Sequence, residues 1–219
     1  MKKTSETDFV VRLAKFFIPF ILGFGVFGSI GFLMDESLRV AYWPLLSGYF
    51  FPPLGKESII PAGIALGINP IVMGLSVAFI DVVVALFLVW NYDLAKKIPI
   101  IGKFIMKVEE KGESAEEKYG WIKPLRFIGI VLFVIVPFQG SGGLVGSIVG
   151  RLVGMKPWNT FYAISIGAIV GCLLIATFSK AFLLFAEINT TLTIAIVAVI
   201  ASIIGGFYFY KRYKKKQKA

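Results

Sequence analysis

The chain has 219 residues, of which 57% are hydrophobic and 16% are charged, and its mean hydropathy is +0.81. Soluble globular domains are roughly 45–50% apolar. Their helices also keep a polar face, which the long unbroken apolar runs of this chain lack. The composition therefore excludes an ordinary soluble domain and predicts an all-α integral membrane protein.

The formal net charge is +10, and the chain has one cysteine and no histidine. The lysines and arginines gather mainly in three short stretches beside apolar runs, so this charge indicates membrane topology and not a nucleic-acid partner. Without histidine, and with Cys172 as the lone cysteine, a disulfide framework, a Cys/His metal site and Ser-His or Cys-His catalysis are excluded. We therefore expect no metal, no cofactor and no enzymatic activity.

The first half of the chain, residues 1–92, begins with a basic arm. Because no small-residue cleavage site follows the first apolar run, we expect an uncleaved span and not a signal peptide. The elements predicted after the arm are a full span at Phe16–Leu33, an interfacial helix at Asp35–Trp43, a broken apolar stretch at Leu45–Asn69 and a second full span at Ile71–Trp90.

The second half, residues 126–210, follows a linker at 93–125 that mixes lysines with glutamates and is predicted to form a surface helix. Its predicted elements are a broken apolar stretch at Phe127–Met155 and full spans at Trp158–Phe182 and Leu192–Tyr210. A basic tail, residues 211–219, ends the sequence.

The two broken stretches contain prolines and glycines that interrupt any helix. Each arm beside an interruption has about 10–14 residues, which is too short to cross the bilayer, so we predict a re-entrant helical hairpin in each stretch. The number of membrane crossings would have the same parity if each stretch formed two tight full spans, so that alternative is open. Broken backbone at membrane depth can coordinate a solute. The hairpin positions that we expect to form the site are Pro53, Gly55, Pro61, Gly63, Pro137, Gly140, Ser141, Gly142 and Gly146.

Positive charge predicts the orientation, because an excess of lysine and arginine marks the cytoplasmic ends of spans. If the arm, the linker and the tail are all inside, the first hairpin enters from outside and the second from the cytoplasm. We expect a multi-pass protein of the cell membrane with both termini in the cytoplasm. The basic linker and tail would contact anionic lipid. The sequence is compatible with a homo-oligomer.

An internal repeat supports this arrangement. A shift of 87 positions, from Gly67 to Gly154, also aligns Gly63 with Gly150 and Pro70 with Pro157. Charge places the two copies in opposite orientations, and inverted repeats with discontinuous helices are typical of transport sites near the bilayer midplane.

Four ionisable residues lie at or near membrane depth: Lys56, Glu57, Asp81 and Arg151. A charge at the centre of a span costs about 2.5–3.5 kcal/mol, so these side chains should pair or face a polar cavity. We expect Glu57 or Asp81 to meet Arg151, with snorkelling of Lys56 and Arg151 to the interfaces as the alternative. These four are the candidate substrate- or ion-binding residues, although Asp81 could also be a purely structural partner.

Two motifs carry a family resemblance. The segment 53–63, Pro-Leu-Gly-Lys-Glu-Ser-Ile-Ile-Pro-Ala-Gly, and the segment 136–147, Val-Pro-Phe-Gln-Gly-Ser-Gly-Gly-Leu-Val-Gly-Ser, resemble the DedA (VTT-domain) superfamily and most closely its small multidrug export branch. The resemblance implies two facing re-entrant hairpins and proton-dependent transport or movement of lipids such as polyprenyl phosphates. Glu57 would be the hairpin acid. Many members carry arginines just after the second-hairpin proline, whereas this chain has Gln-Gly-Ser-Gly at 139–142.

These features lead to one hypothesis and two alternatives. The hypothesis is a small carrier in which Glu57 and Asp81 exchange protons or a cation while the hairpins bind an amphipathic or anionic substrate, such as a polyprenyl phosphate or a drug-like compound. The alternatives are an uncoupled lipid scramblase and a membrane assembly factor that transports nothing.

Overall fold

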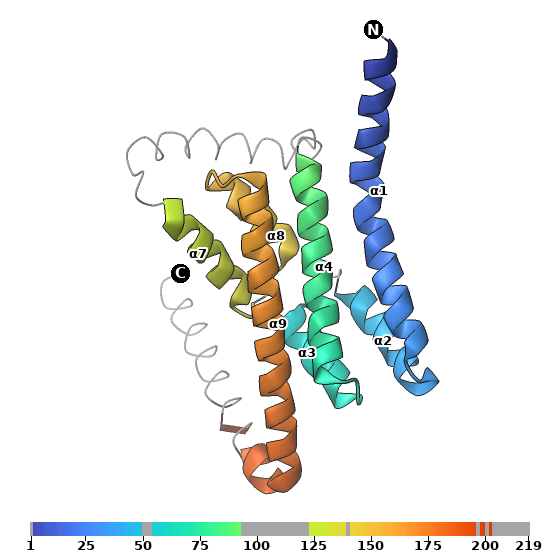
Figure 1. The fold of residues 1–219 in the computed structure, drawn as a ribbon. Helices are drawn as coiled ribbons and strands as arrows, with labels where there is room; N and C mark the ends of the chain where they lie inside the picture. The colour runs from blue at the N-terminus through green and yellow to red at the C-terminus, as the bar shows by residue number, and fades with distance from the viewer. Residues whose placement is uncertain are drawn as a thin grey trace, which may run out of the picture. The chain divides into compact units, whose positions relative to one another are not determined.

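The computed structural model describes residues 2–49, 54–92, 123–138, 141–195, 198, 199 and 202, and most of this part of the chain is helical (Figure 1). The chain divides into two compact units, Met1–Thr177 and Phe178–Ala219. The packing described below lies within the first unit. The helices are α1 (Lys2–Leu33), α2 (Glu36–Gly48), α3 (Lys56–Ala65), α4 (Pro70–Trp90), α7 (Lys123–Ile135), α8 (Gly143–Leu152) and α9 (Pro157–Ile188).

Among the described residues, three helices are long and apolar enough to cross a membrane: Phe9–Leu33 of α1, the whole of α4 and the whole of α9. They coincide with the first three predicted spans, although α1 and α9 are longer than predicted. Large apolar side chains of α1 are exposed, with Phe24 at 76%, as is expected of a helix that faces hydrocarbon. Most of the fourth predicted span, Leu192–Tyr210, lies outside the described residues, as do most of the linker 93–125 and the whole tail 211–219.

Local signals set where the spans begin. Asn69 precedes α4, and its side-chain oxygen accepts a hydrogen bond from the amide of Ile71 at 2.9 Å. Pro70 occupies the first turn, where its missing N–H costs nothing. α9 likewise begins with a proline, Pro157. These ends agree with the predicted spans to one residue.

Arg39 of α2 fixes the corner between α1 and α2. Its guanidinium donates to the carbonyls of Gly31 at 2.8 Å, Phe32 at 3.1 Å and Met34 at 2.8 Å. The last carbonyls of a helix have no partner within the helix, and a cation there also interacts favourably with the helix dipole. Arg39 therefore caps α1.

The first broken stretch differs from its prediction. The interfacial helix expected at Asp35–Trp43 and the hairpin arm expected from Leu45 are one helix, α2, which continues through Pro44. Tyr42 and Leu46 are buried on the same face of this helix, and the Tyr42 hydroxyl is 2.9 Å from Ser76 Oγ of α4. Packing against α3 and α1, together with the contact of Tyr42 with α4, holds the helix together across the proline. Sequence propensity alone predicts a break there.

The predicted repeat extends over three helices. The bounds of α2 and α3, and the start of α4, recur 87 positions later as the bounds of α7 and α8 and the start of α9. Both short helices end in the same cap. The amides of Gly67 and Ile68 bond back to Ile64 and Gly63, and those of Gly154 and Met155 bond back to Arg151 and Gly150, each at 3.0 Å.

The cap glycines are the only described residues with positive φ, at 91° for Gly67 and 80° for Gly154. This left-handed conformation favours glycine, and the pattern is a Schellman motif. Close packing is repeated as well: a Cβ on Gly63 would lie 2.6 Å from Met73 Sδ, and one on Gly150 would lie 2.6 Å from Thr160 Cγ2. Met73 and Thr160 are themselves related by the same offset. The two repeats, α2 to α4 and α7 to α9, therefore share backbone and packing geometry.

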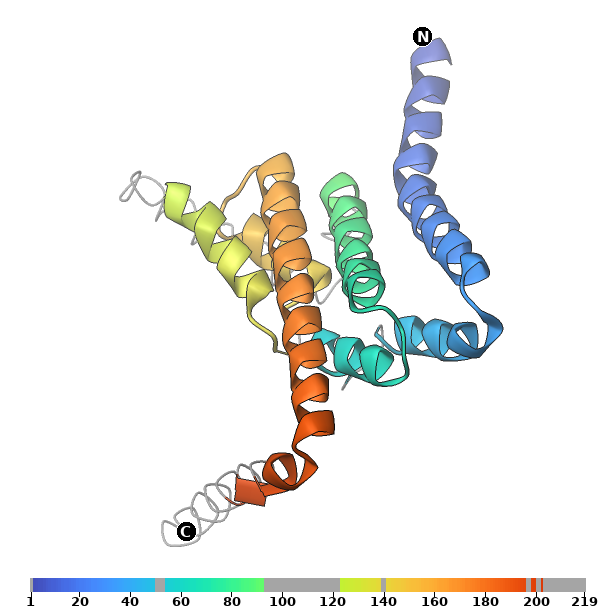
Figure 2. The same ribbon diagram turned by 60° about the horizontal axis from the view of Figure 1, so that its bottom comes forward.

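The two repeats run in opposite directions. In both views α4 and α9 are antiparallel, with α2 and α3 near one end of α4 and α7 and α8 near the other (Figures 1 and 2). α4 is the central helix, because α1, α3 and α8 all pack against it. α9 approaches α7 at Gly167 and Gly171, where a Cβ would lie within 3.0 Å of the α7 backbone.

Candidate functional site

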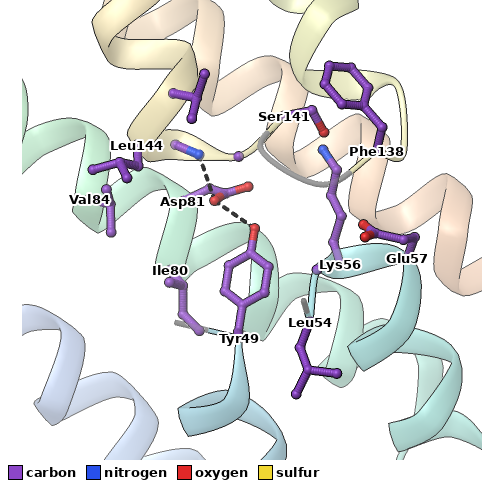
Figure 3. A pocket seen from close by; sticks show the side chains of 14 residues that line it. Tyr49, Leu54, Lys56, Glu57, Ile80, Asp81, Val84, Phe138, Ser141 and Leu144 are labelled. Carbon is purple, nitrogen blue, oxygen red and sulfur yellow. Dashed lines mark hydrogen bonds between the residues drawn. The ribbon is translucent and has the colours of Figure 1, made fainter. Parts of the chain in front are cut away.

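A cavity of about 330 Å³ lies where the two interrupted segments meet. It is bounded by the middle of α4 and by the starts of α3 and α8, together with residues that precede each short helix (Figure 3). Its charged lining consists of Lys56, Glu57 and Asp81, and its apolar lining consists of Leu54, Ile80, Val84, Phe138, Leu144 and Val145. The cavity thus combines a few ionisable groups with apolar walls, as small-molecule sites do.

Asp81 is the most constrained of the three charged residues. It is 2% exposed, and its Oδ1 accepts a hydrogen bond from the Tyr49 hydroxyl at 2.9 Å and from the Gly143 amide at 2.7 Å. Its Oδ2 is buried and has no hydrogen-bond partner among the described residues. The protein therefore fixes one oxygen of the carboxyl group, whereas the other has no such bond among the described residues.

Glycine at the start of α8 makes this contact possible. A Cβ on Gly143 would overlap the main chain of Asp81, and a Cβ on Gly142 would lie 2.7 Å from Asp81 Oδ1 and 2.9 Å from the Tyr49 hydroxyl oxygen. Only a residue without a side chain lets the first turn of α8 approach α4 this closely. The glycine-rich sequence that predicted a helix break thus also allows a close approach between α4 and α8.

Two helix N-termini meet the cavity. Gly55 precedes α3 and Gly142 precedes α8, and both have extended backbone. The first amides of a helix have no partner within the helix and carry partial positive charge, which stabilises nearby anions. Glu57 lies in the first turn of α3, and Asp81 accepts from the first amide of α8. Each helix end thus has a carboxyl group close to it.

Lys56 is buried, with 2% exposed, and its ammonium group donates to the carbonyl oxygen of Val134 near the end of α7. That carbonyl is one of the last of its helix, which have no intrahelical partner. Lys56 therefore links the first repeat to the second. The alternative of snorkelling by Lys56 does not describe this structure, because its ammonium group finds an acceptor inside the protein.

Glu57 folds back over the preceding backbone, and its carboxyl oxygens lie where a Cβ on Gly55 would be. Its Oε2 is buried without a hydrogen-bond partner among the described residues. Ser141 lies opposite and is fully buried, and its hydroxyl donates to the Val136 carbonyl at 2.7 Å. This bond closes the turn between α7 and α8, so the Ser141 hydroxyl shapes the cavity.

Arg151 does not line the cavity. It lies in the last turn of α8, which places it about 12 Å along the helix axis from Gly143. Its Nη1 donates to the Met155 carbonyl at 2.6 Å, and its guanidinium lies 4.6 Å from the ring centroid of Tyr92. The expected pairing of Arg151 with Glu57 or Asp81 is therefore wrong. Both acids line the cavity at the start of α8, whereas Arg151 lies at the other end of this helix.

The predicted hairpin positions separate into three groups. Gly55, Ser141 and Gly142 line the cavity. Pro53 and Gly140 lie outside the described residues. The remaining positions do not line it: Pro61 and Gly63 lie within α3, Gly146 lies within α8, and Pro137 lies in the turn after α7.

Sequence reasoning missed three groups of the site: the Tyr49 hydroxyl, the Gly143 amide and the Val134 carbonyl. The last two are backbone groups whose contacts depend on tertiary structure. Tyr49 did give a signal, because a tyrosine beside a helix break in an apolar stretch needs a partner for its hydroxyl.

Comparison with known proteins identifies the family. A family model described as "Putative small multi-drug export protein" matches residues 58–174, which include Asp81 and Gly143 and begin just after Lys56 and Glu57. No curated protein and no solved structure matches the chain. The wider link to the DedA superfamily stays a prediction from the motifs. The matched segment covers more than half of the chain, so the chain belongs to this family of small export proteins, whose name indicates a membrane transporter and not an enzyme.

Proposed function

We propose that this protein exports an amphipathic substrate, and that protons or a cation exchanged at Asp81 and Glu57 drive the export. The observation that carries the proposal is the carboxyl group of Asp81. It is buried in the middle of a candidate span, beside a cavity, with one oxygen bonded and the other unpartnered among the described residues. Ionisable residues at such positions in membrane helices are typical of ion and substrate pathways.

The hydrogen bonds of Asp81 suggest how exchange could drive movement. Tyr49 follows α2 in the first repeat, and Gly143 begins α8 in the second. A proton or cation that neutralises Asp81 weakens both bonds together, because hydrogen bonds to an ionised group are about twice as strong as neutral ones. The end of α2 and the start of α8 would then be free to separate, which couples occupancy of the carboxyl group to the relative position of the repeats.

In this proposal α2 with α3, and α7 with α8, are re-entrant hairpins that enter from opposite sides of the membrane. Helices of 13 and 10 residues are about 15–20 Å long, whereas the hydrocarbon core is about 30 Å thick. With the basic linker and tail in the cytoplasm, the first pair enters from outside. The protein would then be a multi-pass protein of the cell membrane whose basic segments contact anionic lipid.

Transport into sealed vesicles tests the proposal. Purified protein is reconstituted in liposomes, a pH gradient is imposed, and movement of a fluorescent amphipathic compound, a labelled phospholipid and a labelled polyprenyl phosphate is followed. We expect movement of at least one of these that needs the gradient and falls by about tenfold or more in Asp81→Asn and Glu57→Gln, as for loss of a buried charge interaction.

Glu36→Gln is the matched control, because it makes the same acid-to-amide change at an exposed position at the start of α2. It should transport like the unmodified protein. Lipid equilibration that does not depend on the pH gradient would identify an uncoupled scramblase instead. If none of the compounds moves in active, folded preparations, transport is contradicted and an assembly role is favoured.

A further inference from the structure

A second cavity adjoins the site. It has a volume of about 310 Å³ and lies between α1 and α4, with a lining that is almost entirely apolar. Phe20, Phe24 and Phe27 of α1 contribute to it. The two cavities share Ile80, Val84 and Leu144, so a molecule that passes these three side chains would contact both. In the close-up these three lie on the side of the polar cavity away from Lys56 and Glu57 (Figure 3).

Each helix N-terminus at the polar cavity already has a carboxyl group close to it, so the described side-chain groups left without a partner there are acceptors, which favour a cation. The described lining of this cavity holds two carboxyl groups, of Glu57 and Asp81, against one ammonium group, of Lys56. The ammonium group already donates to the Val134 carbonyl, whereas Glu57 Oε2 and Asp81 Oδ2 are buried acceptors without partners among the described residues. A buried acceptor left without a donor is unfavourable. A positively charged group beside either carboxyl group would supply the donor that its second oxygen lacks.

From these observations we infer that the substrate of the proposed exporter is an amphipathic cation. Its charged amine or ammonium group lies beside Asp81 and Glu57, and its hydrocarbon part extends past Ile80, Val84 and Leu144 into the α1–α4 cavity. The inference rests on the proposed function and adds the substrate class and its orientation. Each cavity alone is near the lower limit of about 300 Å³ for a small-molecule site, so the two together suit a drug-sized amphiphile better than either alone.

Binding at equilibrium, with no gradient, tests the inference separately from transport. The protein is placed in lipid nanodiscs, and binding of radiolabelled decyltrimethylammonium and of decyl phosphate is measured, with empty discs subtracted. These probes share a chain length and differ in the sign of the head group. We expect saturable binding of the cation and, for the anion, binding at least about tenfold weaker.

Variants then locate each end of the ligand. Asp81→Asn and Glu57→Gln should each weaken cation binding by about tenfold or more, and Lys56→Met should strengthen it. Gly23→Phe should weaken it by filling the apolar cavity, of which Gly23 is part of the lining. Gly28→Phe is the matched control on the same helix, since nothing lies within 4 Å of a Cβ at Gly28, and it should leave binding unchanged.

Two results would overturn the inference: preferential binding of decyl phosphate that is lost in Lys56→Met, or cation binding that is unaffected by both carboxyl substitutions. Melting temperatures of all variants show which are folded, and the comparison of the two probes needs no variant. If the cation binds as expected but no gradient moves it, coupled transport fails while the binding site stands. If transport is coupled but only anions bind, the inference fails while the proposed function stands.

Discussion

Asp81 is held through a single oxygen by two donors from distant parts of the chain. Tyr49 is 32 positions before it and Gly143 is 62 positions after it. Hydrogen bonds to an ionised carboxylate contribute about 1.5–3 kcal/mol, against about 0.5–1.5 kcal/mol for neutral pairs. The hydroxyl bond from Tyr49 to Asp81 should therefore contribute more to stability than a hydroxyl bond between neutral groups.

Tyr49→Phe tests this difference. It removes one donor to Asp81 and should lower the free energy of unfolding by about 1.5–3 kcal/mol. Tyr42→Phe is the matched comparison, because the Tyr42 hydroxyl is also 2.9 Å from its partner but that partner is the neutral hydroxyl of Ser76. Thermal unfolding in detergent, followed by circular dichroism, measures both. Equal losses would indicate that the Tyr49 bond does not go to an ionised group.

At the residue scale, the sequence predicted which charged residues lie together better than which of them form pairs. Asp81, Lys56 and Glu57 could be singled out because charge in an apolar stretch is costly, and all three line one cavity. Arg151 met the same criterion, yet it lies at the far end of α8 from Asp81. The cost of burying a charge predicts that a partner exists, whereas the partner's identity depends on how helices pack.

The short helices depend on glycine for position as well as for their ends. Gly143 brings the first turn of α8 against the α4 backbone at Asp81, and a Cβ there would overlap that backbone. Main-chain atoms cannot move aside as a flexible side chain can. The close approach of α8 to α4 therefore requires glycine at this position.

Gly143→Ala should push α8 away from α4 and break the bond from its amide to Asp81. Overpacking of this kind costs about 1–3 kcal/mol, so we expect a lower melting temperature together with loss of transport. Gly129→Ala in α7 makes the same substitution where nothing lies within 4 Å of the added atom, and it should be neutral or slightly stabilising because alanine favours helix. A stable, fully active Gly143→Ala protein would contradict the packing described above.

Element ends were predicted well where proline acts locally and poorly where packing overrides it. The starts of α4 and α9 follow from Asn69-Pro70 and from Pro157, whereas the ends of the two short helices at Gly67 and Gly154 were not predicted. Pro44 does not end α2, because Tyr42 and Leu46 hold the helix against its neighbours. Local propensity cannot show that compensation.

At the scale of the whole molecule, the repeat predicts membrane sidedness. Leu66 follows α3 and Val153 follows α8 at equivalent positions, and both side chains are exposed, at 57% and 37%. With the proposed topology, Leu66 faces outside and Val153 faces the cytoplasm. Cys172 is the only cysteine, and it is buried, so its replacement by alanine gives a background for labelling.

Single cysteines at the two positions, Leu66→Cys and Val153→Cys, should react with a membrane-impermeant maleimide from opposite sides of intact cells or vesicles. The external reagent should label the first before lysis and the second only after it. Labelling of both from one side would show that the two repeats are not inverted in the membrane, and the proposed hairpins would then be wrong. Labelling of each from the other side would reverse the assigned orientation.

The two repeats share a backbone arrangement but differ in the side chains at equivalent positions. The positions 87 residues after Lys56, Glu57 and Asp81 hold Gly143, Leu144 and Ala168. In a carrier with two chemically equal halves, the states open to either side would be related by a two-fold axis and would have equal energy. The proposed carrier cannot have states related in this way, because all three charges belong to its first half. Its affinity for a substrate can thus differ between the two faces of the membrane, while the final distribution of the substrate still depends only on the gradients.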